Sequence, residues 1–275
     1  MLKLIKIYYT LLSIISPNLA AKSAFLTFQK VRKKDIRNRE KPYFLKGIIS
    51  KVSFEPENLT LIEYGQQYDD VILLIHGWDS NAGCMSAISE MLLKNQKHII
   101  SFNLPGHADY TRNSTNLQEC QLALQAILAK IPSHKKISII SHSFGSAVTS
   151  YALSINKRQI DKLIFLTSPD KIIDIFSDFK KIISLGDKSY NILLNKAAKV
   201  IKENVLNFEV NQKLKLCNFN SLHLFHDKND KIIPFQNSLR IHNNITSSKI
   251  YEYENIGHYR MLWNKKLIND IQNIF

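Results

Sequence analysis

One pentapeptide, Ser141-His142-Ser143-Phe144-Gly145, sets the strongest limit on how this chain of 275 residues can fold. The β-branched run before it predicts a strand, and the residues after it favour a helix. A strand that turns at once into a helix holds its central serine in a strained conformation, so the residues two before and two after must be small. Ser141 and Gly145 satisfy this need, and the pattern reads S-x-S-x-G rather than G-x-S-x-G.

Ser143 is therefore a candidate nucleophile. The helix expected from Phe144 directs its free N–H groups and the positive end of its dipole toward Ser143, where negative charge develops during acyl transfer. The alternative interpretation is a buried strand–helix turn in which the serine only caps the helix.

Strand-like and helix-like segments alternate along most of the chain. Strands are expected at 47–54, 59–64, 71–75, 98–102, 137–142, 162–168, 221–225 and 249–253, and helices at 82–94, 116–130, 144–156, 236–243 and from 264. The first two strands form an antiparallel pair, and the apolar runs that follow are typical of strands buried on both faces. This order predicts an α/β fold with a mostly parallel central sheet and helices on both faces.

The alternation stops between Pro169 and Asn220, where helices are expected at 172–183 and 190–205 without a strand. We interpret this segment as an inserted helical cap over the carboxyl ends of the strands. The predicted domains are a basic N-terminal helical arm at 1–44, a core at 45–169 and 221–275, and a cap at 170–220. The apolar residues of 172–183 suggest an apolar acyl group, or they serve only the packing of the cap.

A serine nucleophile needs a general base, and in this topology the acid and then the base follow the serine along the chain. His242 and His258 lie beyond the acid candidates of the later loops. His242 falls inside an expected helix, whereas His258 follows a strand and Gly257 in a loop. We therefore predict His258 as the base; the alternative is a surface loop histidine.

Three aspartates are candidates for the carboxylate that orients this base. Asp230 is preferred because it lies at the apex of the loop after the strand at 221–225. Asp227 stands close to the strand end, where turning toward His258 is harder, and Asp170 follows the preceding strand as a third candidate.

The tetrahedral intermediate of acyl transfer needs two converging N–H donors. Phe144 supplies one, and the loop after 71–75 should supply the other. Trp78 is the expected second donor, because Gly77 lets the backbone approach closely. His76 is interpreted as a structural residue of that loop.

Charge is concentrated near the N-terminus. The net charge is +14; residues 1–51 hold 12 Lys or Arg and two acidic residues, whereas the other 224 residues hold 25 and 21. The cluster at 30–39 can meet anionic lipid or nucleic acid, or form a solvated helix face. The apolar segment at 2–15 is expected to be an amphipathic helix on the domain or a membrane face; a cleaved secretory signal is the alternative.

The three cysteines, Cys84, Cys120 and Cys217, lie far apart without metal-ligand spacing. No disulfide framework, metal site or cofactor is therefore predicted, and a reducing compartment is favoured.

With these features together, the chain resembles the α/β-hydrolase superfamily, in particular bacterial esterase-like serine hydrolases, across about residues 45–275. Five motifs carry the resemblance: the segments at 74–78, 103–107, 141–145, 226–234 and 257–260. The resemblance implies Ser143 as nucleophile, Asp230 as acid and His258 as base. It also implies Trp78 and Phe144 as oxyanion donors, in agreement with the assignments above. Ser141 and Asn103 depart from the family pattern, which usually has Gly and Asp there.

The expected function is hydrolysis of a carboxylic ester, or a related acyl bond, through an acyl-enzyme on Ser143. Thioester cleavage and acyl transfer use the same triad, and a non-catalytic binding protein of this fold is the alternative from another class. We expect a small-molecule acyl substrate, peripheral membrane contact through the basic arm, and no nucleic-acid partner. The expected location is the cytoplasm, with membrane association, or export if the N-terminus is a signal.

Overall fold

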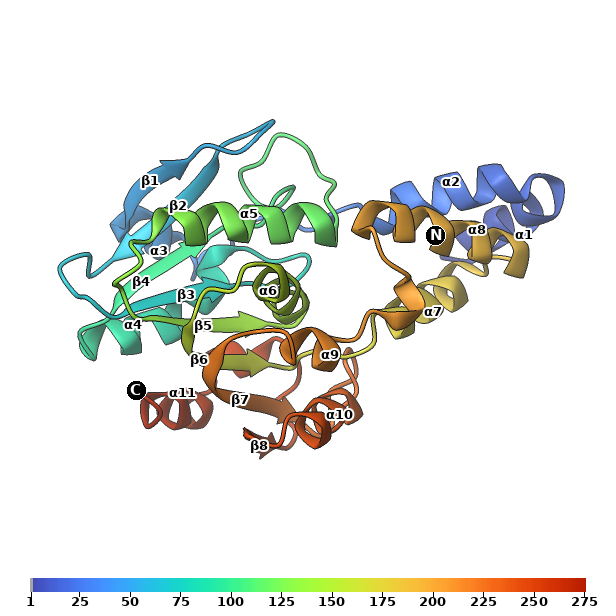
Figure 1. Cartoon of the computed structure of the whole chain (residues 1–275). Coiled ribbons are helices and arrows are strands. Elements are labelled where there is room, and N and C mark those ends of the chain that lie inside the picture. Colours follow the sequence, from blue (N-terminus) through green and yellow to red (C-terminus); the bar gives the residue numbers. More distant parts are fainter. Residues whose placement is uncertain (1) are drawn as a thin grey trace.

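The protein is described here by a computed structural model that covers residues 2–275 (Figure 1). One eight-stranded sheet has the order β1-β2-β4-β3-β5-β6-β7-β8. The β1–β2 and β2–β4 pairs are antiparallel, and all other neighbours are parallel. The strands are β1 (Ile48–Val52), β2 (Leu59–Tyr64), β3 (Val71–Ile75), β4 (His98–Phe102), β5 (Ile137–His142), β6 (Ile160–Leu166), β7 (Phe219–Asp227) and β8 (Ser248–Tyr253).

Helices surround this sheet and extend beyond it. The α-helices are α1 (Leu2–Ile15), α2 (Pro17–Phe28), α3 (Lys41–Lys46), α4 (Ser86–Lys94), α5 (Leu117–Lys130), α6 (Phe144–Ile155), α7 (Ile172–Ile183), α8 (Asp187–Ile201), α9 (Val210–Leu214), α10 (Gln236–Asn244) and α11 (Lys265–Gln272). Short 3₁₀ turns are η1 (Ala82–Met85), η2 (Val205–Asn207) and η3 (Arg260–Trp263).

The continuous apolar runs predict which strands are covered on both faces. All five residues of β3 are buried, and they alternate between two apolar clusters. Leu73 and Ile75 pack in the cluster that holds Leu124 of α5, whereas Leu74 packs with Ile88 of α4. Figure 1 shows α5 and α6 over one face and α4 and α11 on the other. The predicted fold class is confirmed.

The N-terminal segment forms the helix expected at 2–15, since α1 ends at Ile15. Pro17 then opens a second helix, α2, which was not predicted separately. Pro is suited to a first helical turn, because the N–H that it lacks would have no partner there. The interpretation of 30–39 as a helix face is wrong, since residues 31–37 form no helix.

Two N-terminal helices and two helices of the insertion after β6 form one helical lobe, which we define as α1, α2, α7 and α8. Figure 1 shows these four helices side by side at one end of the molecule. The Phe28 ring stacks on Phe176 with centroids 4.3 Å apart and meets Phe179 edge-on at 5.1 Å. The backbone N–H of Gly186 donates to Ser13 Oγ at 3.0 Å. The helices of 172–201, predicted as part of a cap, thus share their apolar side with the N-terminal hairpin.

This shared side bears on the apolar residues of 172–183. Phe176 and Phe179 are buried against Phe28 of the N-terminal hairpin, which we define as α1 and α2. Ile172 and Ile183 are buried in the same apolar cluster. Their contacts favour the interpretation that these residues pack the lobe.

We predict that Phe28→Ala loosens the lobe and leaves the sheet intact. The loss of the aromatic contacts should lower the local unfolding free energy of the lobe by about 2 kcal/mol. Hydrogen-exchange protection of amides in 2–28 and 172–201 should therefore fall about 30-fold, with β3 and β5 unchanged. Leu26→Ala, at an exposed position of the same helix, is the control. Equal protection in both variants would contradict the prediction.

Candidate active site

Ser143 lies at the turn between β5 and α6, in a conformation that side chains rarely adopt. Its φ is +53° and its ψ is −121°. Such a backbone costs about 1–3 kcal/mol, and it persists only where the surroundings fix it. The Ser143 N–H donates to the carbonyl oxygen of Leu166 at 2.9 Å, which ties the turn to the end of β6. The turn leaves the serine partly exposed at the edge of the sheet.

Gly145 allows α6 to start against the end of β3. A Cβ on this residue would lie 2.6 Å from the carbonyl oxygen of Ile75 and 2.7 Å from that of His76. Both neighbours are backbone atoms, so they cannot rotate away. Position 145 therefore requires glycine, because the start of α6 lies so close to the end of β3.

A hydrogen-bonded chain joins Ser143, His258 and Asp230. His258 Nε2 lies 3.0 Å from Ser143 Oγ, and His258 Nδ1 lies 2.7 Å from Asp230 Oδ2. In the tautomer that suits a base, Nδ1–H donates to the carboxylate and Nε2 accepts from the serine hydroxyl. His258 and Asp230 are both buried. The three predicted residues are thus brought together in the predicted order.

Asp230 is held as a carboxylate by its surroundings. Its Oδ1 accepts from the N–H groups of Ile232 and Ile233 at 2.7 and 3.0 Å. Burial acts to raise the pKa of Asp230, but the hydrogen bond and charge of His258 and the two backbone donors outweigh it, so the pKa lies below its ordinary value. The carboxylate is therefore negative at neutral pH.

The competing candidates have other partners. Asp227 accepts from the N–H of Gly257 and, at 2.8 Å, from that of Asn229. It thus holds the loop that carries His258, a role that the sequence analysis missed although its place at the end of β7 signals it. His242, the other histidine considered, lies in α10 and pairs with Ser248 Oγ at 2.8 Å.

Asp170 belongs to a separate buried network. Its Oδ1 accepts from the side-chain amide of Asn211 at 2.8 Å, and its Oδ2 accepts from Arg240 Nε at 3.1 Å. These contacts join the start of the insertion to α9 and α10. Asp170 therefore serves the docking of the insertion.

The backbone N–H groups of Trp78 and Phe144 are both available. Within residues 2–275 neither donates a hydrogen bond to another protein group. Gly77 brings the Trp78 loop against the elbow, since a Cβ there would lie 3.1 Å from Ser143 Cβ. The Trp78 and Phe144 rings meet edge-on with centroids 5.0 Å apart. An oxyanion-binding role for these N–H groups stays a prediction.

Comparison with known sequences decides the family. A sequence profile described as alpha/beta hydrolase fold matches residues 70–223, more than half of the chain. The chain belongs to the α/β-hydrolase fold family. The matched range includes Trp78 and Ser143 and ends before Asp230 and His258, so the last two assignments depend on the geometry above.

A curated relative gives a partial match to this α/β-hydrolase. The Arabidopsis thaliana protein named "Putative methylesterase 11, chloroplastic" is 27% identical over 128 residues. The match covers 42% of this chain and 33% of that protein, so the chain spans about a third of the relative's length.

Solved structures share the fold of this α/β-hydrolase at low identity. An esterase from Pyrococcus furiosus gives a TM-score of 0.66 at 16% identity, covering 89% of this chain and 96% of that one. The alpha/beta hydrolase domain-containing protein 10 from mouse gives 0.62 at 17% identity, covering 82% and 96%. The thioesterase domain from the curacin biosynthetic pathway gives 0.60 at 13% identity, covering 83% and 98%.

The two departures of this α/β-hydrolase from its family pattern have structural explanations. Ser141 Oγ lies 2.7 Å from Thr149 Oγ1, which itself donates to the carbonyl oxygen of Gly145 at 2.8 Å. The extra hydroxyl is thus accommodated by a partner on α6. Asn103 Oδ1 accepts from the Ala82 N–H at 2.9 Å, and its Nδ2 donates to Asp109 at 2.7 Å. Asn103 holds a turn and touches no member of the triad.

Buried histidines surround the triad in the neutral form. His76 Nδ1 lies 2.7 Å from the carbonyl oxygen of Gly77, and its Nε2 accepts from the Leu104 N–H at 2.9 Å. Burial holds the pKa of His76 well below its ordinary value. His142 donates to the carbonyl oxygen of His258 at 3.1 Å, and burial together with the nearby His258 lowers the pKa of His142 to about 3. These rings fix loops and carry no charge at neutral pH.

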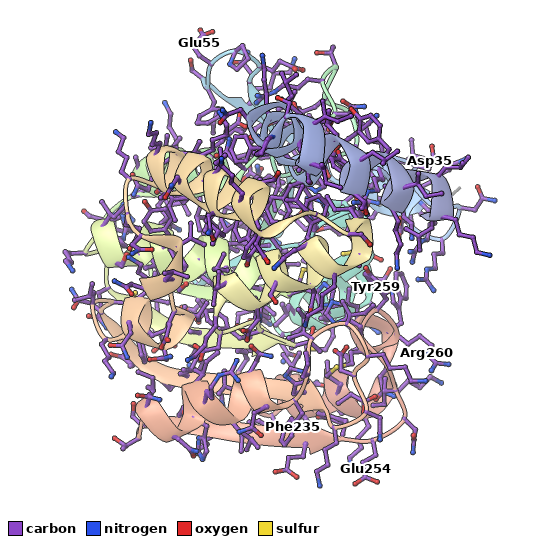
Figure 2. The ribbon with its side chains drawn as sticks, turned by 90° about the vertical axis from the view of Figure 1, so that its right-hand side faces the viewer. Asp35, Glu55, Phe235, Glu254, Tyr259 and Arg260 are labelled. Carbon is purple, nitrogen blue, oxygen red and sulfur yellow. The ribbon has the colours of Figure 1, made fainter. Side chains whose placement is uncertain are left out.

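The basic segment at 30–39 contacts the loop that carries Trp78. Asp79, the residue after Trp78, accepts from the backbone N–H of Arg32 at 2.7 Å. In Figure 2, Asp35 of this segment and Tyr259 lie along one side of the molecule. The N-terminal chain is therefore fixed beside the candidate active site, a contact that the sequence analysis did not foresee.

The part of the chain that the structure describes, residues 2–275, holds neither a metal centre of protein side chains nor a membrane-spanning helix. No group of three or more His, Cys, Asp or Glu side chains in this range is arranged to hold a metal ion. No helix in the same range is long and apolar enough to cross a bilayer.

We predict that Gly145→Ala destabilises the protein, against the usual helix preference. Alanine in place of glycine stabilises an ordinary helix by about 1 kcal/mol. Here the new methyl group collides with two carbonyl oxygens, so unfolding free energy should fall by about 1–3 kcal/mol. Urea unfolding measures the change, with Ile155→Ala at an exposed position of the same helix as a control expected to stay near wild type. An unchanged or raised midpoint for Gly145→Ala would refute the close approach.

The neutral histidines predict a loss of stability in mild acid. Burial lowers the pKa values of four histidines in the folded protein: His76, His107, His142 and His226. As the pH falls below about 6.5, these groups therefore become protonated in the unfolded chain while they stay neutral in the folded protein. Unfolding free energy should then fall with pH, by up to about 1.4 kcal/mol per pH unit for each group. For His142 the decline should continue to about pH 3.

Urea unfolding at a series of pH values from about 7 to about 5 tests this linkage. His142→Gln removes one titrating group and keeps a donor for the His258 carbonyl. The decline should be shallower in this variant by up to about 1.4 kcal/mol per pH unit. Parallel curves for the two proteins would show that His142 does not titrate with folding.

Proposed function

We propose that this α/β-hydrolase is a serine hydrolase that cleaves a carboxylic ester through an acyl-enzyme on Ser143. Family membership supports a hydrolase in general. The observation that carries the finer proposal is the hydrogen-bonded chain from Ser143 through His258 to Asp230, with distances of 3.0 and 2.7 Å.

In the acylation half, Ser143 Oγ attacks the ester carbonyl carbon while His258 Nε2 takes the hydroxyl proton. Asp230 accepts from His258 Nδ1 and stabilises the imidazolium. The N–H groups of Trp78 and Phe144 donate to the oxyanion. When the tetrahedral intermediate collapses, the bond to the alcohol oxygen breaks and His258 returns the proton to the leaving alkoxide.

In the deacylation half, His258 takes a proton from water as the water oxygen attacks the acyl carbon. Collapse of the second intermediate breaks the bond to Ser143, which regains the proton from His258 and releases a carboxylic acid. These steps use no metal or cofactor. Asp230 is needed in both halves because both pass through a protonated His258.

The position of Ser143 in the elbow supports its role as nucleophile. The strained turn presents Oγ beyond the sheet edge, and the start of α6 lies directly behind it. The dipole of this helix and the free N–H of Phe144 favour the negative charge of the intermediate. A serine that only capped α6 would accept a hydrogen bond from an N–H of the first turn, and Ser143 makes no such side-chain bond within residues 2–275.

The test uses an active-site label and a panel of esters. A serine-directed fluorophosphonate should label the wild-type protein and fail to label Ser143→Ala. Asp230→Asn should label far more slowly and hydrolyse p-nitrophenyl esters with kcat lower by a factor on the order of 10⁴, because the imidazole tautomer and the imidazolium lose their partner. Asp170→Asn is the control for loss of a buried carboxylate and should keep its labelling.

Labelling of Ser143→Ala at the wild-type rate would remove this residue from the mechanism. Labelling without turnover of any p-nitrophenyl ester, together with turnover of acyl thioesters, would favour a thioesterase. Absence of both would favour the non-catalytic binding protein.

A further inference from the structure

Helix α1 has an apolar face that the protein does not cover. Its inner side packs through Tyr9, whose hydroxyl lies 2.9 Å from Thr27 Oγ1 of α2. Its outer side carries a row of large apolar side chains, each between 54% and 79% exposed. We define this apolar row as Leu4, Ile7, Leu11, Ile14 and Ile15.

The spacing puts the whole apolar row on one side of the helix. Successive members stand three or four residues apart, apart from the final adjacent pair, and residues at that spacing share a helix face. Single exposed apolar residues are normal on a soluble domain, but a continuous row marks a surface that contacts another phase or molecule. Helix α2 also exposes large apolar side chains, Leu19 and Leu26, and the exposed Lys22 lies between them in the sequence.

The charge of the helical lobe is mainly positive. Within residues 2–28, α1 and α2 carry Lys3, Lys6 and Lys22 and no Asp or Glu. Lys3 at the start of α1 and Lys22 on α2 are both exposed. The part of the lobe at 172–201 holds five Lys and three Asp, one of which, Asp187, follows the Gly186 that contacts Ser13 of α1. A partner that complements this surface is therefore both apolar and negatively charged.

Two other occupants fit less well. A second copy of the chain, placed row against row, would bring two mainly positive surfaces together, which is unfavourable. Burial across a bilayer is excluded by length, because 14 residues of helix span about 21 Å and a hydrocarbon core is about 30 Å thick.

We propose that the outer face of α1 docks on an anionic lipid surface. The apolar row lies at the boundary of headgroups and acyl chains, with the helix parallel to the membrane plane. Lys3 and Lys22 meet lipid phosphates, where each nearby cation strengthens attachment. Because α1 packs on α2 and α7, the whole helical lobe is the part that faces the membrane (Figure 1). This proposal is independent of the hydrolase reaction.

The experiment is vesicle flotation of the full chain. The wild-type protein should float with vesicles of phosphatidylcholine and phosphatidylglycerol and stay behind with phosphatidylcholine alone. Bound protein should decrease as salt is raised, since screening weakens the phosphate contacts. Ile7→Gln with Leu11→Gln should lower the partition constant about tenfold or more. Lys3→Gln with Lys22→Gln should lower it about 30-fold.

The matched control is Leu45→Gln with Leu216→Gln, which removes two exposed apolar side chains outside the helical lobe. This control should float like wild type. All variants change exposed side chains, and an unchanged thermal midpoint checks that each is folded.

Failure of the wild-type protein to float with anionic vesicles would overturn the proposal. So would equal flotation of the apolar-row variant and the wild type. A different result would make the apolar row an interface between two copies of the chain. In that case the wild-type protein would sediment as a dimer, the Ile7/Leu11 variant would sediment as a monomer, and neither would bind vesicles.

Discussion

The close approach of α6 to the end of β3 is the constraint on which the candidate active site depends. Gly145 lies against two carbonyl oxygens, so α6 begins within contact distance of the loop that carries Trp78. The same approach forces the backbone at Ser143 into its positive φ, and the hydrogen bond to Leu166 holds it there. Ser143 and the free N–H groups of Trp78 and Phe144 are thus positioned by backbone packing, which does not relax when a side chain changes its rotamer.

His258 and Asp230 reach Ser143 through a different kind of support. Both lie on loops, and each loop is fixed by hydrogen bonds to backbone N–H groups. Asp230 is held by Ile232 and Ile233, and Asp227 holds Gly257 next to His258. Two neighbouring aspartates of one loop therefore divide the work: one orients the imidazole ring, and the other orients the loop that carries it.

The sequence predicts the parts of this site that follow from local pattern. Apolar runs such as 71–75 identify buried strands, and the small residues around Ser143 identify the elbow. Because parallel strands end at one edge, strand order alone brings Asp230 and His258 toward the serine. What the sequence does not predict arises from tertiary contact. Asp227 as a loop support and the Arg32–Asp79 hydrogen bond each depend on a partner far away in the chain.

The aromatic cluster of Phe28, Phe176 and Phe179 has a consequence for how the chain can be shortened or recombined. The N-terminal hairpin and the insertion after β6 cover each other, although more than 140 residues of sequence separate them. A truncated chain that begins after Phe28 would keep all eight strands together with Ser143, Asp230 and His258, but it would leave two phenylalanine rings in water and would tend to aggregate. Inheritance of the two segments is therefore coupled: a homologue that lost the hairpin would need a smaller or more polar insertion to avoid an exposed apolar surface.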